Sequence, residues 1–131
     1  MNRDKKITIS VDCMGGDNSI DDILGGVNSF CSENNNDTLL LHGDKKAIAS
    51  ALEKYPEIKQ MCKIKHCDKV IQMGDKPSQS IRGGKNSSMW NAIESVKTSQ
   101  AEVVISCGNT GSLMAISTLL LRKLPNVKRP A

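Results

Sequence analysis

The sequence has few aromatic residues, and those it has are scattered. Phenylalanine, tyrosine and tryptophan make up 2% of its 131 residues, as Phe30, Tyr55 and Trp90. A hydrophobic core therefore has to come from isoleucine, leucine, valine, alanine and methionine. Surfaces that bind nucleic acid combine dense basic patches with aromatics that stack on bases, and no such segment occurs. With a net charge of only +4, the sequence predicts no nucleic-acid partner, although a mildly basic protein attracts acidic partners and phosphate.

Long apolar segments, a signal peptide and paired cysteines are also missing. The longest apolar-leaning stretch is residues 113–121, which is too short for a bilayer that takes about 20 residues to span. The charged N-terminus MNRDKK runs directly into a strand-like segment, without the apolar core of a signal peptide. The five cysteines are odd in number and form no CxxC motif. A reduced, cytoplasmic protein is therefore the simplest interpretation.

Recognised metal and nucleotide motifs are absent as well. Cys62, His66 and Cys67 come closest to a metal site, but their spacing matches no zinc-ligand pattern and no second ligand pair follows. No GxGxxG sequence follows the first predicted strand, and no Walker A motif occurs. The sequence thus predicts no metal and no cofactor. It argues against dinucleotide dehydrogenases and P-loop NTPases.

Strand-like and helix-like segments alternate along the chain. Short apolar or β-branched runs predict four strands, the last of them buried, over residues 7–11, 38–42, 61–67 and 102–106. Apolar residues at helical spacing predict four helices, over residues 20–30, 47–52, 87–96 and 110–122. The segment 68–85, rich in glycine and proline, is predicted to be loop. This order is typical of one α/β domain in which helices cover both faces of a mostly parallel sheet.

Two glycine-rich turns follow predicted strands, at residues 12–18 (DCMGGDN) and 108–111 (GNTG). In open α/β sheets, ligands bind beyond the carboxyl ends of the strands. Glycine lets the backbone approach an anion closely, and the helix that follows offers free N–H groups. Asn109 and Thr110 add side-chain donors, and Ser112 is available to cap the helix or bind a ligand oxygen. Such turns are also common for purely geometric reasons, so that alternative stays open.

A third segment, SIRGGKNSS at residues 80–88, combines two cations with two serines at a helix start. Arginine binds an anion through two parallel hydrogen bonds, and lysine supplies a point charge. The alternative is that Ser87 is an ordinary helix cap and that Arg82 and Lys85 are merely solvated. Three such segments in one short α/β chain favour a site for an oxyanion or phosphate.

Two aspartates lie at the first glycine-rich turn, and two histidines lie at the ends of predicted strands. Asp17, inside the first turn, is expected to anchor the loop N–H groups, and the role of Asp12 at the strand end stays open. His42 and His66 have no evident acid or nucleophile partner in the sequence. Structural roles are therefore predicted for both histidines.

Three segments together resemble one known family: VDCMGGDNS, MGDKPSQSIRGGKNSSMWNAIESVK and VVISCGNTGSLMAISTLLLRKLPNVKRPA. In this order they are similar to the N-terminal part of bacterial phosphate acyltransferases, the PlsX-type enzymes of phospholipid synthesis. The resemblance implies a three-layer α/β/α fold related to phosphotransacetylase and isopropylmalate dehydrogenase. It implies transfer of a fatty acyl group from acyl carrier protein to inorganic phosphate, which gives acyl phosphate. It also implies a homodimer that is cytoplasmic or peripherally membrane-associated.

The same resemblance assigns residues to the family's cleft. The residues that match its signature segments are Gly15, Gly16, Asp17, Lys85, Ser87, Ser88, Asn109, Thr110 and Gly111. Phosphate is itself the nucleophile in this reaction, so no Ser-His or Cys-His pair is needed, and none is visible. Lys85, the two serines and the turn 109–111 are expected to hold phosphate, with residues 15–17 as the opposite wall.

Residues 1–131 are shorter than half of a typical family member. The chain is therefore expected to be the N-terminal part of a single truncated α/β/α catalytic domain. Its catalytic residues stay unassigned, and the fragment alone is expected to be inactive. Two alternatives remain open: a phosphotransacetylase-like enzyme that uses coenzyme A thioesters, and a module that only binds acyl carrier protein.

Overall fold

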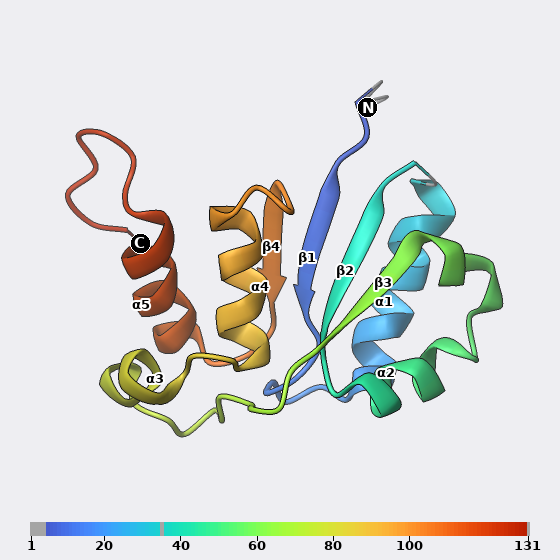
Figure 1. Cartoon of the computed structure of the whole chain (residues 1–131), viewed down its shortest axis with the longest axis horizontal. Helices are drawn as coiled ribbons and strands as arrows, with labels where there is room; N and C mark the ends of the chain where they lie inside the picture. Colours follow the sequence, from blue (N-terminus) through green and yellow to red (C-terminus); the bar gives the residue numbers. More distant parts are fainter. Residues whose placement is uncertain (1–4, 35, 131) are drawn as a thin grey trace.

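The computed structural model in Figure 1 describes residues 5–34 and 36–130. The strands are β1 (Thr8–Asp12), β2 (Thr38–Gly43), β3 (Cys62–His66) and β4 (Val103–Ser106). The helices are α1 (Ile20–Glu33), α2 (Lys45–Leu52), the 3-10 helix η1 (Pro56–Met61), α3 (Pro77–Gly83), α4 (Ser88–Lys97) and α5 (Thr110–Leu121). All four predicted strands and all four predicted helices are present, which confirms the α/β class.

The four strands form one parallel sheet in the order β3-β2-β1-β4. From β1 the chain continues to β2 and β3 on one side, and it then returns to β4 on the other side of β1. Because the direction reverses, the connecting helices lie on opposite faces of the sheet. The carboxyl ends of the strands all point toward the lower edge of the sheet in Figure 1, where α3 lies. This edge is where an α/β sheet holds its ligands.

Local signals fix where the helices begin. The Ser19 hydroxyl accepts a hydrogen bond from the Asp22 amide, and the Asp22 carboxylate accepts one from the Ser19 amide. This reciprocal capping box starts α1 where the sequence predicted. Asp44 caps α2 through a single hydrogen bond, since its carboxylate accepts from the Ala47 amide at 3.0 Å.

Two apolar clusters lie on the two faces of the sheet and make the fold three-layered, as predicted. Ile9 and Val11 of β1 pack in one cluster with residues of α1 and α2. The alternate residue Ser10 faces the other way, and its hydroxyl donates to the backbone oxygen of Ala92 in α4 at 2.8 Å. On that face α4 and α5 share the second cluster, centred on the fully buried Ile93 and Ile116.

The strand β4 is only half covered, although the sequence predicted a buried strand. Val103 and Ile105 are 41% and 49% exposed. They lie on the same face as Ile9 and Val11. An apolar groove of about 560 Å³ separates β4 from α1 on this face. The prediction was wrong because an apolar run shows only that a strand can be buried. Whether each of its faces is buried depends on where the helices pack on the sheet.

The helix α3 lies inside the segment that was predicted to be loop. Pro77 occupies its first turn, where a missing N–H costs nothing. Ser80 is buried, and its hydroxyl lies 2.6 Å from the hydroxyl of Ser112 in α5. Ile81 is 39% exposed, so no apolar stripe marks the helix in the sequence. Packing against α5 stabilises it instead.

Candidate functional site

The carboxyl ends of β1 and β4 bring the two glycine-rich turns together. Asp12 and Ser106 are register partners on these adjacent strands, so the loops that follow them leave the sheet side by side. The loops are in close contact, since a methyl group added at Gly16 would lie 2.6 Å from the backbone oxygen of Cys107. A residue without a side chain is needed for this approach.

Asp12 anchors both loops. Its Oδ2 accepts a hydrogen bond from the Ser106 hydroxyl at 2.7 Å, and its Oδ1 accepts one from the Met14 amide at 3.1 Å. The Ser106 oxygen in turn accepts a hydrogen bond from the Gly108 amide at 3.1 Å. The expectation that Asp17 is the anchor is wrong, because within the described residues the exposed Asp17 forms no hydrogen bond, whereas Asp12, buried at the strand end, holds both loops.

The environment of Asp12 explains why it acts on its neighbours. Burial raises the pKa of its carboxyl group, and the nearby Ser88 hydroxyl together with the hydrogen bonds from the Ser106 hydroxyl and the Met14 amide opposes that rise. The residue is 2% exposed. Because Asp12 is buried, it acts on a ligand at the loops indirectly, through the loop groups to which it is hydrogen-bonded.

A third segment, residues 69–72, closes the site from the α4 side. The Ser88 amide at the start of α4 donates to the Lys69 oxygen at 3.1 Å. Gly15 faces this segment with a φ of +80°, and a methyl group there would lie 2.5 Å from the Ile71 oxygen. The structure thus brings the predicted residues Gly15, Gly16 and Ser88 into one neighbourhood.

The segment 85–87 offers fewer ligand-binding groups than the sequence predicted. Ser87 is fully buried, and its hydroxyl accepts a hydrogen bond from the Trp90 amide at 3.1 Å. It is therefore the ordinary helix cap that the sequence left as an alternative. Lys85 is exposed, and within the described chain it forms no salt bridge. Its side chain is thus available to a ligand.

The Asn109 side chain is engaged within the fold. Its Nδ2 donates to the backbone oxygens of Gln72, Met73 and Asp75, at 3.1, 3.2 and 2.7 Å. Its Oδ1 accepts a hydrogen bond from the Ser112 amide at 3.1 Å and so caps α5. In this arrangement Asn109 fixes the segment 72–75 against α5, and the cap that the sequence considered for Ser112 is Asn109.

Thr110 and Gly111 occupy the first two positions of α5. Amides at these positions have no partner inside their own helix, and no other acceptor for them occurs in residues 5–34 and 36–130. Thr110 is exposed, and Gly111 packs toward Pro77 of α3. The positive end of a 12-residue helix with two free N–H groups is a favourable place for an anion.

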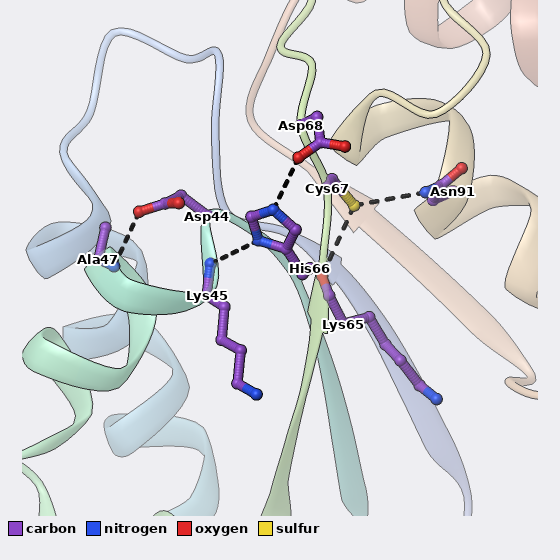
Figure 2. Close-up of polar contacts among 8 residues, drawn as sticks. All are labelled: Asp44, Lys45, Ala47, Lys65, His66, Cys67, Asp68 and Asn91. Atoms are coloured by element: carbon purple, nitrogen blue, oxygen red, sulfur yellow. Dashed lines mark hydrogen bonds and ion pairs between the residues drawn. The ribbon is translucent and has the colours of Figure 1, made fainter.

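His66 and Cys67, which lie at the end of β3, have structural partners (Figure 2). His66 Nδ1 accepts a hydrogen bond from the Lys45 amide at the start of α2, and Nε2 lies 2.8 Å from the Asp68 carboxylate. The sequence missed this acid partner. Cys67 Sγ accepts a hydrogen bond from the Asn91 side chain at 3.4 Å. Across the part of the chain that the structure describes, no three acidic, histidine or cysteine side chains gather closely enough to hold a metal ion.

All five cysteines are free thiols. Burial is the main cause that raises the pKa of Cys13 and of Cys62 to about 12. Only the thiolate of cysteine is a strong nucleophile, so these two residues are structural.

His42 makes the stability of the fold depend on pH. It is 3% exposed, and its Nε2 lies 3.3 Å from the Ser95 hydroxyl. Burial and then the charge of Lys65 lower its pKa from 6.5 to about 4. The unfolded chain therefore binds a proton in this range that the folded chain does not. We expect urea denaturation to show that the free energy of unfolding falls by about 1.4 kcal/mol for each pH unit below 6.5, until His42 protonates in the fold.

The control for this prediction is His42→Gln, which keeps a polar side chain but does not titrate. The difference in unfolding free energy between wild type and variant is expected to shrink steadily as the pH falls toward 4. Parallel pH profiles of the two proteins would contradict the assignment to His42. Carboxyl groups that titrate in the same range affect both proteins equally, so the difference isolates the histidine.

Comparison with known proteins identifies the family. Residues 7–131 match the family model described as "Fatty acid synthesis protein". The chain belongs to this family. Among similar proteins are the phosphate acyltransferases of Cereibacter sphaeroides (45% identical over 126 residues, 96% of this chain) and Caulobacter vibrioides (45% over 127 residues, 97%). The phosphate acyltransferase of Roseobacter denitrificans is 42% identical over 129 residues, or 98% of the chain.

These matches confirm the resemblance carried by the three sequence segments. They cover 34%, 35% and 36% of the three relatives, so the chain spans about a third of the length of the curated relatives it matches. Among residues 5–34 and 36–130, no helix combines the length and the apolar character needed to cross a membrane.

Proposed function

We propose that this member of the fatty acid synthesis family is an acyltransferase of phospholipid synthesis. It transfers a fatty acyl group from acyl carrier protein to inorganic phosphate and forms acyl phosphate. The observation that supports this most is the pair of free amides at the start of α5, beside two loops tied to one carboxylate. Relatives that match nearly the whole chain are named phosphate acyltransferases.

The reaction requires little covalent chemistry from the protein itself. An oxygen of hydrogen phosphate attacks the thioester carbonyl, a tetrahedral oxyanion forms, and the C–S bond breaks. The proton of the phosphate ends on the thiol that leaves, so atoms and charge balance without a further reactant. The site has to orient the phosphate dianion toward the carbonyl and stabilise the oxyanion.

The chain's contribution is to hold phosphate. In this proposal the amides of Thr110 and Gly111 and the Lys85 ammonium bind its oxygens, and the loop from Gly15 to Asp17 forms the opposite wall. Ser87 and Ser88 act by fixing the start of α4, since both are buried. Asn109 acts by capping α5 and holding the segment 72–75.

The partners follow from this activity and from charge. The net charge of +4 suits an acidic carrier protein. We further propose a homodimer in the cytoplasm or at the inner face of the membrane, without nucleic acid, metal or cofactor. A module that only binds the carrier protein would form the same complex without turnover.

The test is thiol release from an acyl carrier protein thioester and from the matching coenzyme A thioester, with and without phosphate. It uses this chain and the protein at the full length that its gene encodes. Phosphate-dependent release from the carrier protein thioester is expected for the full-length protein. Preference for the coenzyme A thioester would favour the phosphotransacetylase-like alternative. Folded full-length protein that binds the carrier but releases no thiol in response to phosphate would overturn the proposal.

Lys85→Ala tests the phosphate site. In the full-length protein we expect the KM for phosphate to rise about tenfold, because a charge-assisted hydrogen bond contributes about 1.5–3 kcal/mol. Lys97→Ala is the matched control, since Lys97 is another exposed lysine but lies at the far end of α4. Unchanged KM and kcat in Lys85→Ala, or the same change in both variants, would remove Lys85 from the site.

A further inference from the structure

We propose that Asp12 and Ser106 are positioning residues that hold the two glycine-rich loops in the arrangement that binds phosphate. The inference rests on the proposed function, because it takes phosphate as the ligand of these loops. It adds residues that the sequence left without a role, because the role of Asp12 stayed open and Ser106 was only the end of a predicted strand.

Hydrogen bonds connect both glycine-rich loops to the Asp12 carboxylate. The Met14 amide in the β1 loop donates directly to Asp12, at 3.1 Å. The β4 loop reaches the same carboxylate through Ser106, whose hydroxyl donates to Asp12 at 2.7 Å and accepts from the Gly108 amide at 3.1 Å. Ser106 can bridge in this way because a hydroxyl group both donates and accepts.

The Gly108 turn has little conformational freedom around this bridge. Gly108 is buried. A methyl group there would lie 3.0 Å from the Met89 side chain, 3.3 Å from the Ser106 oxygen and 3.5 Å from the Asp12 carboxylate. The orientation of Gly108 in turn sets where Asn109 caps α5 and where the amides of Thr110 and Gly111 point. Displacement of Ser106 would therefore be transmitted to the proposed phosphate donors.

The buried Asp12 carboxylate lowers the stability of the fold when it is ionised. Burial raises the pKa of Asp12, so ionised Asp12 opposes folding, and its contribution to stability decreases as the pH rises above 3.8. A buried charge that weakens the fold is typical of a site where geometry matters more than stability. This is consistent with a role for Asp12 in fixing the position of the two loops relative to each other.

The chain offers a matched control on the same strand. Ser10 lies two residues before Asp12 on the same face of β1, is fully buried, and donates to the Ala92 oxygen at 2.8 Å. Like the Ser106 hydroxyl, it donates a hydrogen bond to another element, although Ser10 is fully buried whereas Ser106 is half-buried, and it lies away from the loops. Loss of Ser10 should therefore affect stability without affecting the loop arrangement.

The experiment measures the dissociation constant for inorganic phosphate by calorimetric titration of the full-length protein. The proteins compared are wild type, Ser106→Ala, Ser106→Thr and Ser10→Ala. We expect Ser106→Ala to weaken phosphate binding about tenfold, which corresponds to the loss of about one hydrogen bond's free energy. Ser106→Thr keeps the hydroxyl and is expected to bind within about twofold of wild type. Ser10→Ala is expected to bind like wild type even where urea denaturation shows that it is less stable.

Each outcome bears on the inference. Wild-type protein that binds no phosphate would overturn the proposed phosphate site, and the inference with it. Phosphate binding that is equally strong in wild type and Ser106→Ala would overturn the inference alone. Equal weakening in Ser106→Ala and Ser10→Ala would reduce both serines to a structural role. If Ser106→Ala does not fold, Ser106→Cys replaces it, because a thiol keeps the size of the side chain but is a weak hydrogen-bond partner.

Discussion

Replacing Gly15 with alanine is expected to destabilise the fold by about 2–4 kcal/mol. Gly15 has a φ of +80°, which a side chain disfavours, and the added methyl group would lie 2.5 Å from the Ile71 oxygen and 3.2 Å from Val70. The nearest of these atoms belongs to the backbone, so relief requires a shift of the segment 69–72 or of the β1 loop. Urea denaturation followed by the fluorescence of Trp90 measures the effect.

Gly26→Ala is the control for this prediction. Gly26 lies within α1, and a methyl group there would have no atom within 4 Å. Because alanine favours the helix over glycine, this variant is expected to gain about 0.5–1 kcal/mol. Opposite signs in the two variants would show that the conformation at position 15, and not the loss of a glycine as such, sets the cost. A Gly15→Ala protein as stable as wild type would contradict the contact between the β1 loop and residues 69–72.

Replacing Asn109 with alanine is expected to remove about 3 kcal/mol from the free energy of unfolding. The helix cap on Ser112 accounts for about 1 kcal/mol. The remainder comes from the lost hydrogen bonds between Nδ2 and the three backbone oxygens, since a typical hydrogen bond contributes about 0.5–1.5 kcal/mol. Hydrogen exchange is expected to accelerate across residues 72–79, because this segment is then no longer held on α5.

Asn109→Ser separates the two roles of this side chain. Serine is as good a helix cap as asparagine, but it is too short and has too few donors to reach the oxygens of Gln72, Met73 and Asp75. The serine variant is therefore expected to recover about 1 kcal/mol relative to alanine, while its fast exchange over residues 72–79 persists. Slow exchange in both variants would show that Asn109 does not hold this segment.

The sequence predicted the helices and strands well wherever the signal is local. The β-branched run before Asp12 and the apolar spacing after Ser19 describe single elements, and each formed as predicted. Capping residues act over three or four positions, so a helix that begins after Ser19 was predictable without the fold. The helix α3 was missed because it has no apolar stripe of its own and depends on the contact between Ser80 and Ser112.

Side-chain roles at the candidate site were harder to predict than its location. The three glycine-rich or serine-rich segments do meet at the carboxyl edge of the sheet, as the α/β pattern indicated. Asn109, however, is used for the fold, and Asp12 replaces Asp17 as the anchor. The type of each residue showed whether its side chain can donate or accept a hydrogen bond, but not which group it bonds to.

The sequence by itself determined the α/β class, the starts of α1 and α5, the glycine-rich turns and the family. Each of these depends on residues close together in the chain, or on a motif that can be matched without a structure. Only the tertiary structure decided that β4 has an open face, that α3 forms, and that one carboxylate holds both loops. Asp12 and Ser106 are 94 positions apart. Their contact exists because β1 and β4 pair in one register, and that register is set by packing across the whole sheet.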